Sequence, residues 1–258
     1  MRKVRRAYGL SYFRRCPQTN QWELLMSRRR YTYAFFSFVM GDYTSANDPR
    51  VIEHISGMTT AEKVNLTSLN FDYLWFLCWG TDPTTVSFYR GTTKIFGEIR
   101  DEYFKSRNVR DYIEKKKKFE TNFKQDSGRF LKFLLARSKF RGELWEIPKG
   151  RKKHNSESDL TCSIREFQEE TGVRKKMYQL CFDIDPIQYS YSVGNFTFIN
   201  KYYVAIATDS PKLRSCVGTI VDAPVELRWM KLSQIETLEI ASVHLQNIRT
   251  LFGKVNKK

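Results

Sequence analysis

The sequence predicts an α/β domain that is interrupted by an all-helical insertion. Segments rich in aromatic, β-branched and basic residues occur near the start of the chain and return in its second half, as expected of strands. The segment between them has helical periodicity almost throughout. The α/β domain would therefore be discontinuous, comprising residues 1–36 and 126–258, and the helical insertion would comprise residues 37–125.

The first predicted elements are two strands that form a hairpin-like pair. They cover residues 3–15 and 22–30, and the turn-forming residues 17–20 separate them. In the insertion, Thr59 and Glu62 have the spacing of a capping box, and a helix is predicted to continue from them through Leu66, Leu69 and Trp75. Further helices are expected over residues 86–105, 108–124 and 128–137.

The second half of the chain alternates between strands and helices. A short strand over residues 143–148 ends at a proline, and a glycine-containing loop leads from it to a helix from about Asp159 to Thr171. The remaining elements are predicted strands at 186–192, 196–207 and 225–230 and a final helix at 239–252.

The composition indicates a folded protein with a polyanionic partner. The 258 residues carry a formal net charge of +16, and 41% of them are hydrophobic, which excludes an intrinsically disordered chain. A basic excess of this size favours nucleic acid, anionic lipid or polyphosphate as the partner. The basic start lacks the apolar segment of a signal peptide, and the five scattered cysteines include no C-x-x-C pair. We therefore expect a cytoplasmic protein without a transmembrane segment, a disulfide framework or a zinc site.

One segment carries a distinct chemical signal: GRKKHNSESDLTCSIREFQEETGV, residues 150–173. Residues on a helix are about 100° apart, so Leu160, Ile164 and Phe167 would form one apolar stripe. An acidic stripe would lie on the other side of the helix, and a C-cap glycine would end it. The members of this acidic stripe are Glu166, Glu169 and Glu170.

Neighbouring carboxylates on a helix repel one another, so a compensating cation is expected. Mg²⁺ is a natural candidate, because it takes oxygen ligands from few carboxylates and shares its remaining positions with substrate phosphates. For an isolated motif of this kind, a solvated acidic face is the more common explanation.

The context of the acidic stripe resembles the Nudix box, G-x5-E-x7-R-E-U-x-E-E-x-G-U, in which U is apolar. This sequence reads G-x6-E-x7-R-E-F-Q-E-E-T-G-V, with one extra residue between Gly150 and Glu157. The resemblance implies an α/β/α sandwich with a mixed sheet. It also implies a pyrophosphohydrolase that uses Mg²⁺ or Mn²⁺ to cleave a nucleoside diphosphate linked to another group.

The resemblance also assigns roles to residues. Glu157 and Arg165 would be a supporting pair that fixes the loop against the helix. The carbonyl of Gly150 and the carboxylate of Glu226 are additional candidate metal ligands, although Glu226 could equally be an ordinary strand-edge residue. The three expected metal ligands are Glu166, Glu169 and Glu170, with Glu166 the leading candidate for the catalytic base. Two questions stay open: whether one or two metal ions act, and which glutamate is the general base.

A narrower resemblance covers roughly residues 22–252. RRRYTYAF (28–35), WEIPKGR (145–151) and the long insertion are similar to the mRNA-decapping enzymes of large cytoplasmic DNA viruses. The similarity implies that capped mRNA is hydrolysed to methylguanosine diphosphate and 5′-monophosphate RNA in the cytoplasm of an infected host cell, with host shutoff as the outcome. The alternatives are a hydrolase of diphosphoinositol or nucleoside polyphosphates and an RNA-binding protein with a relict fold, and homodimer formation stays open.

Cap binding calls for aromatic faces on both sides of a positively charged guanine. Tyr33 and Trp145 are the first candidates, with Lys149 close by, although Trp145 could equally belong to the core. The second face could come from Tyr189, Tyr191 or Tyr202.

Four consecutive lysines, Lys115, Lys116, Lys117 and Lys118, are candidates for RNA binding. With Tyr112, Phe119 and Phe123 interleaved, they predict an insertion that follows an RNA backbone by charge and stacking. Because four consecutive residues spread around a helix, solvation alone is the alternative for some of them.

Overall fold

The computed structural model describes residues 3–29, 31–78, 109–138, 142–193, 196–208, 226–238, 240 and 242–258. These residues form two compact units. The sheet unit combines the chain up to Arg30 with the described residues from Glu143 onward, and the helical unit lies within Tyr31–Gly142. In the described part, no helix is both long and apolar enough to cross a membrane.

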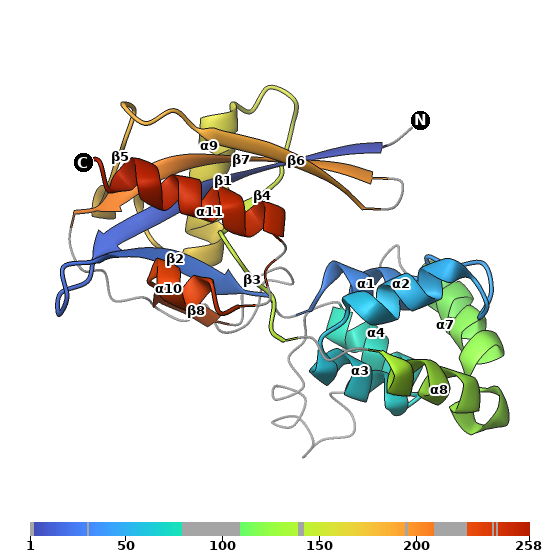
Figure 1. The fold of residues 1–258 in the computed structure, drawn as a ribbon. Coiled ribbons are helices and arrows are strands. Elements are labelled where there is room, and N and C mark those ends of the chain that lie inside the picture. Colours follow the sequence, from blue (N-terminus) through green and yellow to red (C-terminus); the bar gives the residue numbers. More distant parts are fainter. Residues whose placement is uncertain are drawn as a thin grey trace, which may run out of the picture. The chain divides into compact units, whose positions relative to one another are not determined.

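The described part of the sheet unit contains one mixed eight-stranded sheet (Figure 1). Strands β1 and β7 run parallel, pairing from Lys3 opposite Phe196 to Phe13 opposite Ile206, and the other pairs are antiparallel. The order is β3-β2-β1-β7-β5, with β8 on β2, β4 on β1 and β6 on β7. The strands are β1 (Lys3–Arg15), β2 (Trp22–Arg28), β3 (Trp145–Glu146), β4 (Lys149–Gly150), β5 (Tyr178–Leu180), β6 (Ile187–Val193), β7 (Phe196–Ala207) and β8 (Glu226–Met230).

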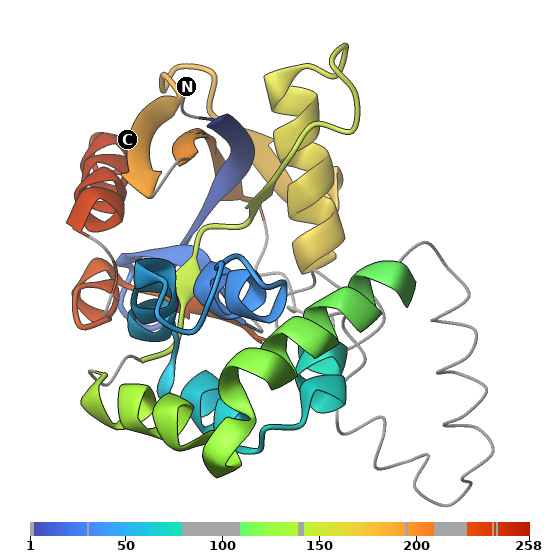
Figure 2. The same cartoon turned by 90° about the vertical axis from the view of Figure 1, so that its right-hand side faces the viewer.

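Helices cover both faces of this sheet (Figure 2). Consecutive strand residues point to opposite faces. Accordingly, Tyr12 packs edge-on against Phe167 with ring centroids 5.3 Å apart, whereas Phe13 packs against Phe252 at 5.1 Å. Phe167 belongs to α9 (Asp159–Thr171), and Phe252 belongs to α11 (Ser242–Val255), which lies on the same side as α10 (Leu232–Ile235). The predicted α/β/α sandwich with a mixed sheet is confirmed.

The helical unit has an aromatic core of its own. Phe38, Phe119 and Phe123 are almost fully buried and lie within ring-contact distance of one another. The helices are α1 (Tyr33–Val39), α2 (Pro49–Gly57), α3 (Thr60–Thr67), α4 (Phe71–Cys78), α7 (Val109–Phe123) and α8 (Arg129–Arg137), with 3₁₀ turns at Gln125–Gly128 and, in the sheet unit, Lys175–Met177.

The two units meet in sequence at positions 30/31 and 142/143, and not at 36/37 and 125/126. Phe35 and Phe38 of α1 and Leu131 of α8 are buried in the helical core. Burial of these side chains assigns both helices to the helical unit.

The helix predicted to continue from Thr59 is divided in two. Its capping box is present, because the Thr59 side chain accepts from the Glu62 N–H and the Glu62 carboxylate accepts from the Thr59 N–H. However, Leu69 has a φ of 51°, a left-handed conformation that ends α3 before α4 begins at Phe71. The helices predicted at 108–124 and 128–137 are confirmed as α7 and α8, and the one predicted at 86–105 lies outside the described residues.

Candidate active site

Helix α9 presents the acidic stripe, and its ends are set by local capping. The Ser158 hydroxyl accepts from the Thr161 N–H at 3.1 Å, and Gly172 ends the helix with a φ of 69°. The predicted span Asp159–Thr171 is confirmed to the residue. Both ends follow from residues inside the motif itself.

The packed side of α9 differs from the prediction. Cys162, Ser163 and Phe167 are buried, whereas Ile164 is half-buried and lines an open pocket. The buried arc therefore lies nearer to the acidic stripe than the apolar pattern predicted. As a consequence, two of the three glutamates are held against the protein instead of facing solvent.

Glu166 and Glu170 both lie beside the two-residue strand β4. The Lys149 N–H donates to Glu170 Oε2 at 3.1 Å. At Gly150, an added Cβ would lie only 2.0 Å from Glu166 Cδ, so a glycine is required for this close approach. Both carboxylates therefore lie directly against strand β4 of the sheet.

The surroundings of Glu170 disfavour its charged form, although two cations lie nearby. Burial, reinforced by the carboxylate of Glu146, raises the pKa of Glu170 to about 8. The charges of Lys149 and Arg29 oppose this rise without cancelling it. Both cations also contact Glu146, at 2.5 and 3.1 Å, and they lower its pKa despite the opposing effect of burial.

Arg165 joins the loop to the helix. Its Nε and Nη2 donate to the two carboxylate oxygens of Glu157 at 2.8 and 3.0 Å, and Nη2 also donates to the Arg151 carbonyl at 2.8 Å. Its Nη1 contacts Glu166 at 2.8 Å. The extra residue in the loop therefore leaves Glu157 in contact with Arg165, in the geometry expected of a supporting pair.

A pH-dependent stability follows from this pair. The hydrogen bonds from Arg165 hold the pKa of Glu157 at about 2, below its ordinary value of 4.5. A depressed carboxylate pKa contributes stability above the unfolded-state value, and this contribution is lost as the pH falls towards the folded-state value. We expect Glu157→Gln to flatten the loss of thermal stability between about pH 4.5 and pH 2, measured by circular dichroism. If the variant and the wild type lost thermal stability equally over this pH range, the result would contradict this prediction.

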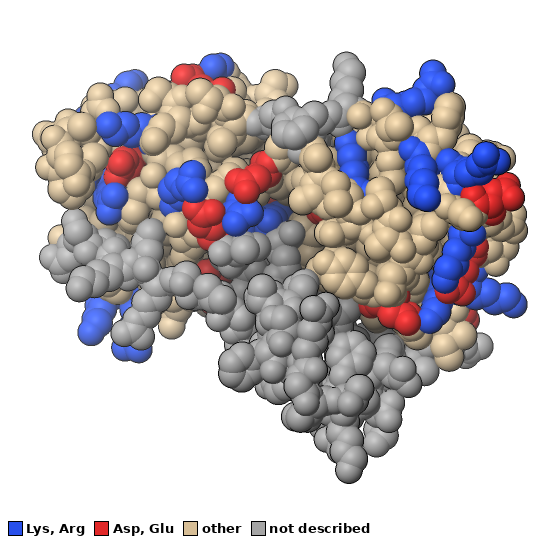
Figure 3. Space-filling model, turned by 90° about the horizontal axis from the view of Figure 1, so that it is seen from below, with Lys and Arg blue, Asp and Glu red and all other residues tan. Residues whose placement is uncertain are grey.

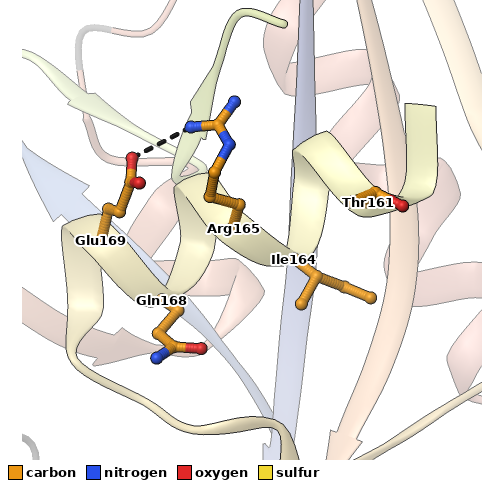
Figure 4. Close-up of a pocket in the computed structure, with 5 residues that line it drawn as sticks. All are labelled: Thr161, Ile164, Arg165, Gln168 and Glu169. Atoms are coloured by element: carbon orange, nitrogen blue, oxygen red, sulfur yellow. Dashed lines mark hydrogen bonds and ion pairs between the residues drawn. The ribbon is translucent and has the colours of Figure 1, made fainter. Parts of the chain in front are cut away.

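Glu169 is the most exposed of the three glutamates, with 41% of its side chain accessible. Lys153 contacts it at 2.9 Å and Arg165 at 3.0 Å, and the Lys153 hydrogen bond is the main cause of its lowered pKa. It borders an open pocket on the outer side of α9 (Figure 4), whose other lining residues are Thr161, Ile164, Arg165 and Gln168.

Basic side chains neutralise two of the three glutamates, Glu166 and Glu169. In the described residues, no group of three or more His, Cys, Asp or Glu side chains is arranged to hold a metal ion. Arg165 bridges Glu166 and Glu169, and Lys153 holds Glu169 from the loop.

The additional metal-ligand candidate Glu226 is engaged elsewhere. It begins β8, and its carboxylate contacts Arg28 at 3.2 Å and Arg228 at 2.5 Å. Among the described contacts, none joins Glu226 to the glutamates of α9, so its role as a ligand stays a prediction.

Two of the aromatic candidates for cap binding are buried. Trp145 is 3% exposed, its Nε1 donates to Glu143, and the Arg228 guanidinium lies 5.0 Å from its ring centre. Tyr202 is likewise only 3% exposed, so neither ring has an open face for stacking in this structure, and the burial of Trp145 favours the alternative that it belongs to the core.

Other cap candidates keep some accessible surface. Tyr189 is half-buried, its hydroxyl lies 2.7 Å from His244 Nδ1, and Tyr191 stacks on Phe198. Tyr33 begins α1 in the helical unit and is 42% exposed. These assignments stay predictions.

The predicted stacking residues of α7 are also buried. Phe119 and Phe123 are at most 1% exposed and form part of the helical core, so the prediction that they stack on RNA is wrong. Lys116 pairs with Asp72 at 2.7 Å, and Lys118 donates to the Gly41 carbonyl at 2.9 Å. In Figure 3, Lys and Arg on the helical unit (right) lie beside Asp and Glu. Ion pairs such as Lys116 with Asp72 and Arg50 with Asp42 neutralise part of its positive charge.

Sequence reasoning missed Glu146 and Arg29. Glu146 stands three residues before Lys149 in the strand that precedes the box, and this E-x-x-K spacing was the available signal. Arg29 follows β2, and only the pairing of β2 with β3 brings it to Glu146.

An acidic helix packed on a two-residue strand, with an arginine-fixed loop between them, defines a hydrolase site of the Nudix class. The NUDIX domain family model matches residues 123–251, and the chain belongs to this family. It is therefore a Nudix hydrolase.

Particular relatives narrow the comparison. The chain is 32% identical over 211 residues to the mRNA-decapping protein g5R of African swine fever virus, covering 81% of this chain and 75% of that protein. It is 24% identical over 204 residues to a protein of Acanthamoeba polyphaga mimivirus described as a putative mRNA-decapping protein, covering 74% of this chain and 53% of the relative. The resemblance to viral decapping proteins is confirmed. A solved Ap4A hydrolase from C. elegans aligns over 98% of both chains with 10% identity and a TM-score of 0.47.

Proposed function

We propose that this Nudix hydrolase is a metal-dependent mRNA-decapping enzyme, which releases methylguanosine diphosphate and 5′-monophosphate RNA from capped RNA. The observation that supports this most is the 32% identity over 81% of the chain to a viral mRNA-decapping protein. The site of action would be the cytoplasm of an infected cell, where loss of capped mRNA would shut off host synthesis.

The chemistry of the glutamates on α9 suits a Mg²⁺ or Mn²⁺ ion, although in this structure Arg165 holds two of them and the described side chains are not grouped around one metal position. Burial and the neighbouring carboxylate of Glu146 raise the pKa of Glu170, and a divalent cation would stabilise the charged form of this carboxylate. The close approach of Glu166 to Gly150 puts a second carboxylate beside the same strand. All of these groups offer oxygen, the ligand atom that hard cations prefer. Glu166, Glu169 and Glu170 would hold the ion, with Gly150 and Glu226 as additional candidates.

A divalent ion bound there would lower the pKa of a water molecule and neutralise phosphate charge. The Glu166 carboxylate would accept the proton of the attacking water at its free oxygen. Arg165, held by both oxygens of Glu157, keeps Glu166 in position. Lys153, whose side chain is 60% exposed, would release Glu169 and bind a substrate phosphate in its place.

Metal-free protein should show the cost of the partly buried Glu170 carboxylate. A carboxylate with a raised pKa loses stability as the pH rises from its unfolded value, about 4.5, through its folded value of about 8. We expect Glu170→Gln to be more stable than the wild type above pH 8 in a chelator, by roughly 1 kcal/mol or more. Adding Mn²⁺ should raise the melting temperature of the wild type but hardly that of the variant. Equal stability of the two proteins in chelator would argue against an uncompensated charge at Glu170.

The proposed function is tested with RNA labelled in the cap phosphates and incubated with Mg²⁺ or Mn²⁺. We expect release of methylguanosine diphosphate from the RNA and poor action on the free cap dinucleotide. Turnover of diphosphoinositol pentakisphosphate without cap release would overturn the proposal in favour of a polyphosphate hydrolase.

A further inference from the structure

Helix α8 of the helical unit has an exposed face that combines aromatic rings with cations. Phe130 and Phe133 are 39% and 52% exposed, which is unusual for phenylalanine in a folded unit. Arg129, Lys132 and Arg137 are exposed on the same helix. The helix contains no acidic residue, and no described carboxylate pairs with its three cations.

These exposed residues form one continuous surface. At about 100° per residue, they and Ala136 fall within an arc of roughly 160°. The opposite side holds Leu131, which is fully buried, and Leu134 and Leu135, which pack against the helical core. Packing of the leucines therefore fixes which side faces outward, and the phenylalanines remain outside the core.

One cation of this surface already lies over one of its rings. The Arg137 guanidinium lies over the Phe133 ring, 5.0 Å from its centre. Phe130 and Phe133 are three positions apart, so they are neighbours on the helix surface. The result is two adjacent rings with a cation on either side along the helix.

We propose that this face of α8, comprising Arg129, Phe130, Lys132, Phe133 and Arg137, binds a single-stranded segment of the RNA substrate. This proposal rests on the proposed function, in which RNA is the substrate. Bases would stack on the two phenylalanine rings, because every base offers a π-face, and the cations would contact the phosphates.

Charge complementarity favours RNA as the occupant. A surface that binds an apolar protein segment gains nothing from three cations that no described carboxylate pairs, whereas a polyanion with stacked bases uses both the cations and the rings. The face of α8 also offers exposed phenylalanine rings, which α7 lacks. On α7 the phenylalanines are buried, and two of its lysines are engaged by Asp72 and by the Gly41 carbonyl.

The test measures binding of uncapped single-stranded RNA to the full chain by fluorescence anisotropy at several salt concentrations. Phe130→Ala combined with Phe133→Ala should weaken binding at least about tenfold and leave the salt dependence unchanged. Arg129→Gln combined with Lys132→Gln should lower the slope of log K against log salt by about 1.4, since each single-strand phosphate contact contributes about 0.7.

A matched control removes two exposed apolar side chains on other helices of the helical unit. Ile52→Ala combined with Val64→Ala changes residues of α2 and α3 that are 59% and 61% exposed, and it should leave RNA binding unchanged. Unaltered RNA affinity of the α8 phenylalanine variant would overturn the proposal. A selective loss of binding to phosphatidylserine vesicles, or of self-association, would also overturn it.

Because the RNA is uncapped, this result is independent of hydrolysis. Tight RNA binding through α8 without any cap release would reject the proposed function and retain the RNA surface. Cap release, combined with RNA binding that the α8 substitutions do not change, would retain the proposed function and reject the RNA surface on α8.

Discussion

Replacing Glu166 with glutamine should lower the rate of cap hydrolysis by roughly 10²–10⁴-fold while the protein stays folded. Only 18% of this side chain is exposed, and it lies beside Gly150 with Arg165 at 2.8 Å. Glutamine keeps its volume but can neither accept a proton nor neutralise a cation. The rate is measured in single-turnover experiments on cap-labelled RNA, with melting temperature as the test of folding.

The matched control is Glu236→Gln. Glu236 pairs with Arg249 at 2.7 Å on the same unit, so this substitution also removes a glutamate from an arginine. We expect normal hydrolysis from it. Glu169→Gln should abolish hydrolysis and leave RNA binding nearly intact. If Glu166→Gln were as active as Glu236→Gln, Glu166 would have no part in the chemistry.

Replacing Gly150 with alanine should lower hydrolysis by about 10²-fold, because it displaces a catalytic group. The new Cβ would lie 2.0 Å from Glu166 Cδ, and the flexible glutamate side chain would move away from it. We therefore expect a folded protein whose Glu166 is misplaced. In a Glu166→Gln background, Gly150→Ala should add little, since both changes act through the same carboxylate. Additive losses would contradict this mechanism.

Two other glycines separate this effect from general damage. Gly253→Ala introduces a Cβ with no atom within 4 Å and should leave activity unchanged. Gly9→Ala introduces one that lies 2.5 Å from the Pro148 carbonyl and 2.8 Å from the Tyr202 ring. Backbone cannot move aside as a side chain can, so Gly9→Ala should lower the melting temperature, whereas Gly150→Ala should lower mainly the activity.

Helix ends were predictable where the capping residues lie in the sequence at the end of the helix itself. Ser158 and Gly172 cap α9 within the motif, and the capping box of α3 lies in four consecutive residues, so both starts were evident. The break at Leu69 was not predictable, because a leucine with positive φ looks like one more apolar position in a helix. Strand β4 has two residues, too few for any periodicity.

The contacts of the site depend on tertiary structure. The helical pattern placed Ile164 on the buried stripe and the glutamates opposite, yet packing on β4 turned Glu166 and Glu170 towards the protein. Arg29 reaches Glu146 only through strand pairing across more than a hundred residues of sequence. Aromatic content likewise could not distinguish the buried Phe119 from the exposed Phe133.

The most direct test of the site is a Mn²⁺ titration in which bound metal and cap release are measured in the same samples. For the wild type and Glu236→Gln, we expect metal occupancy and hydrolysis rate to rise along one curve. For Glu166→Gln and Glu170→Gln, we expect metal affinity to fall at least about tenfold, as when a metal site loses a ligand or its support. Wild-type metal affinity in both glutamate variants, or cap release without bound metal, would contradict a metal-dependent site on α9.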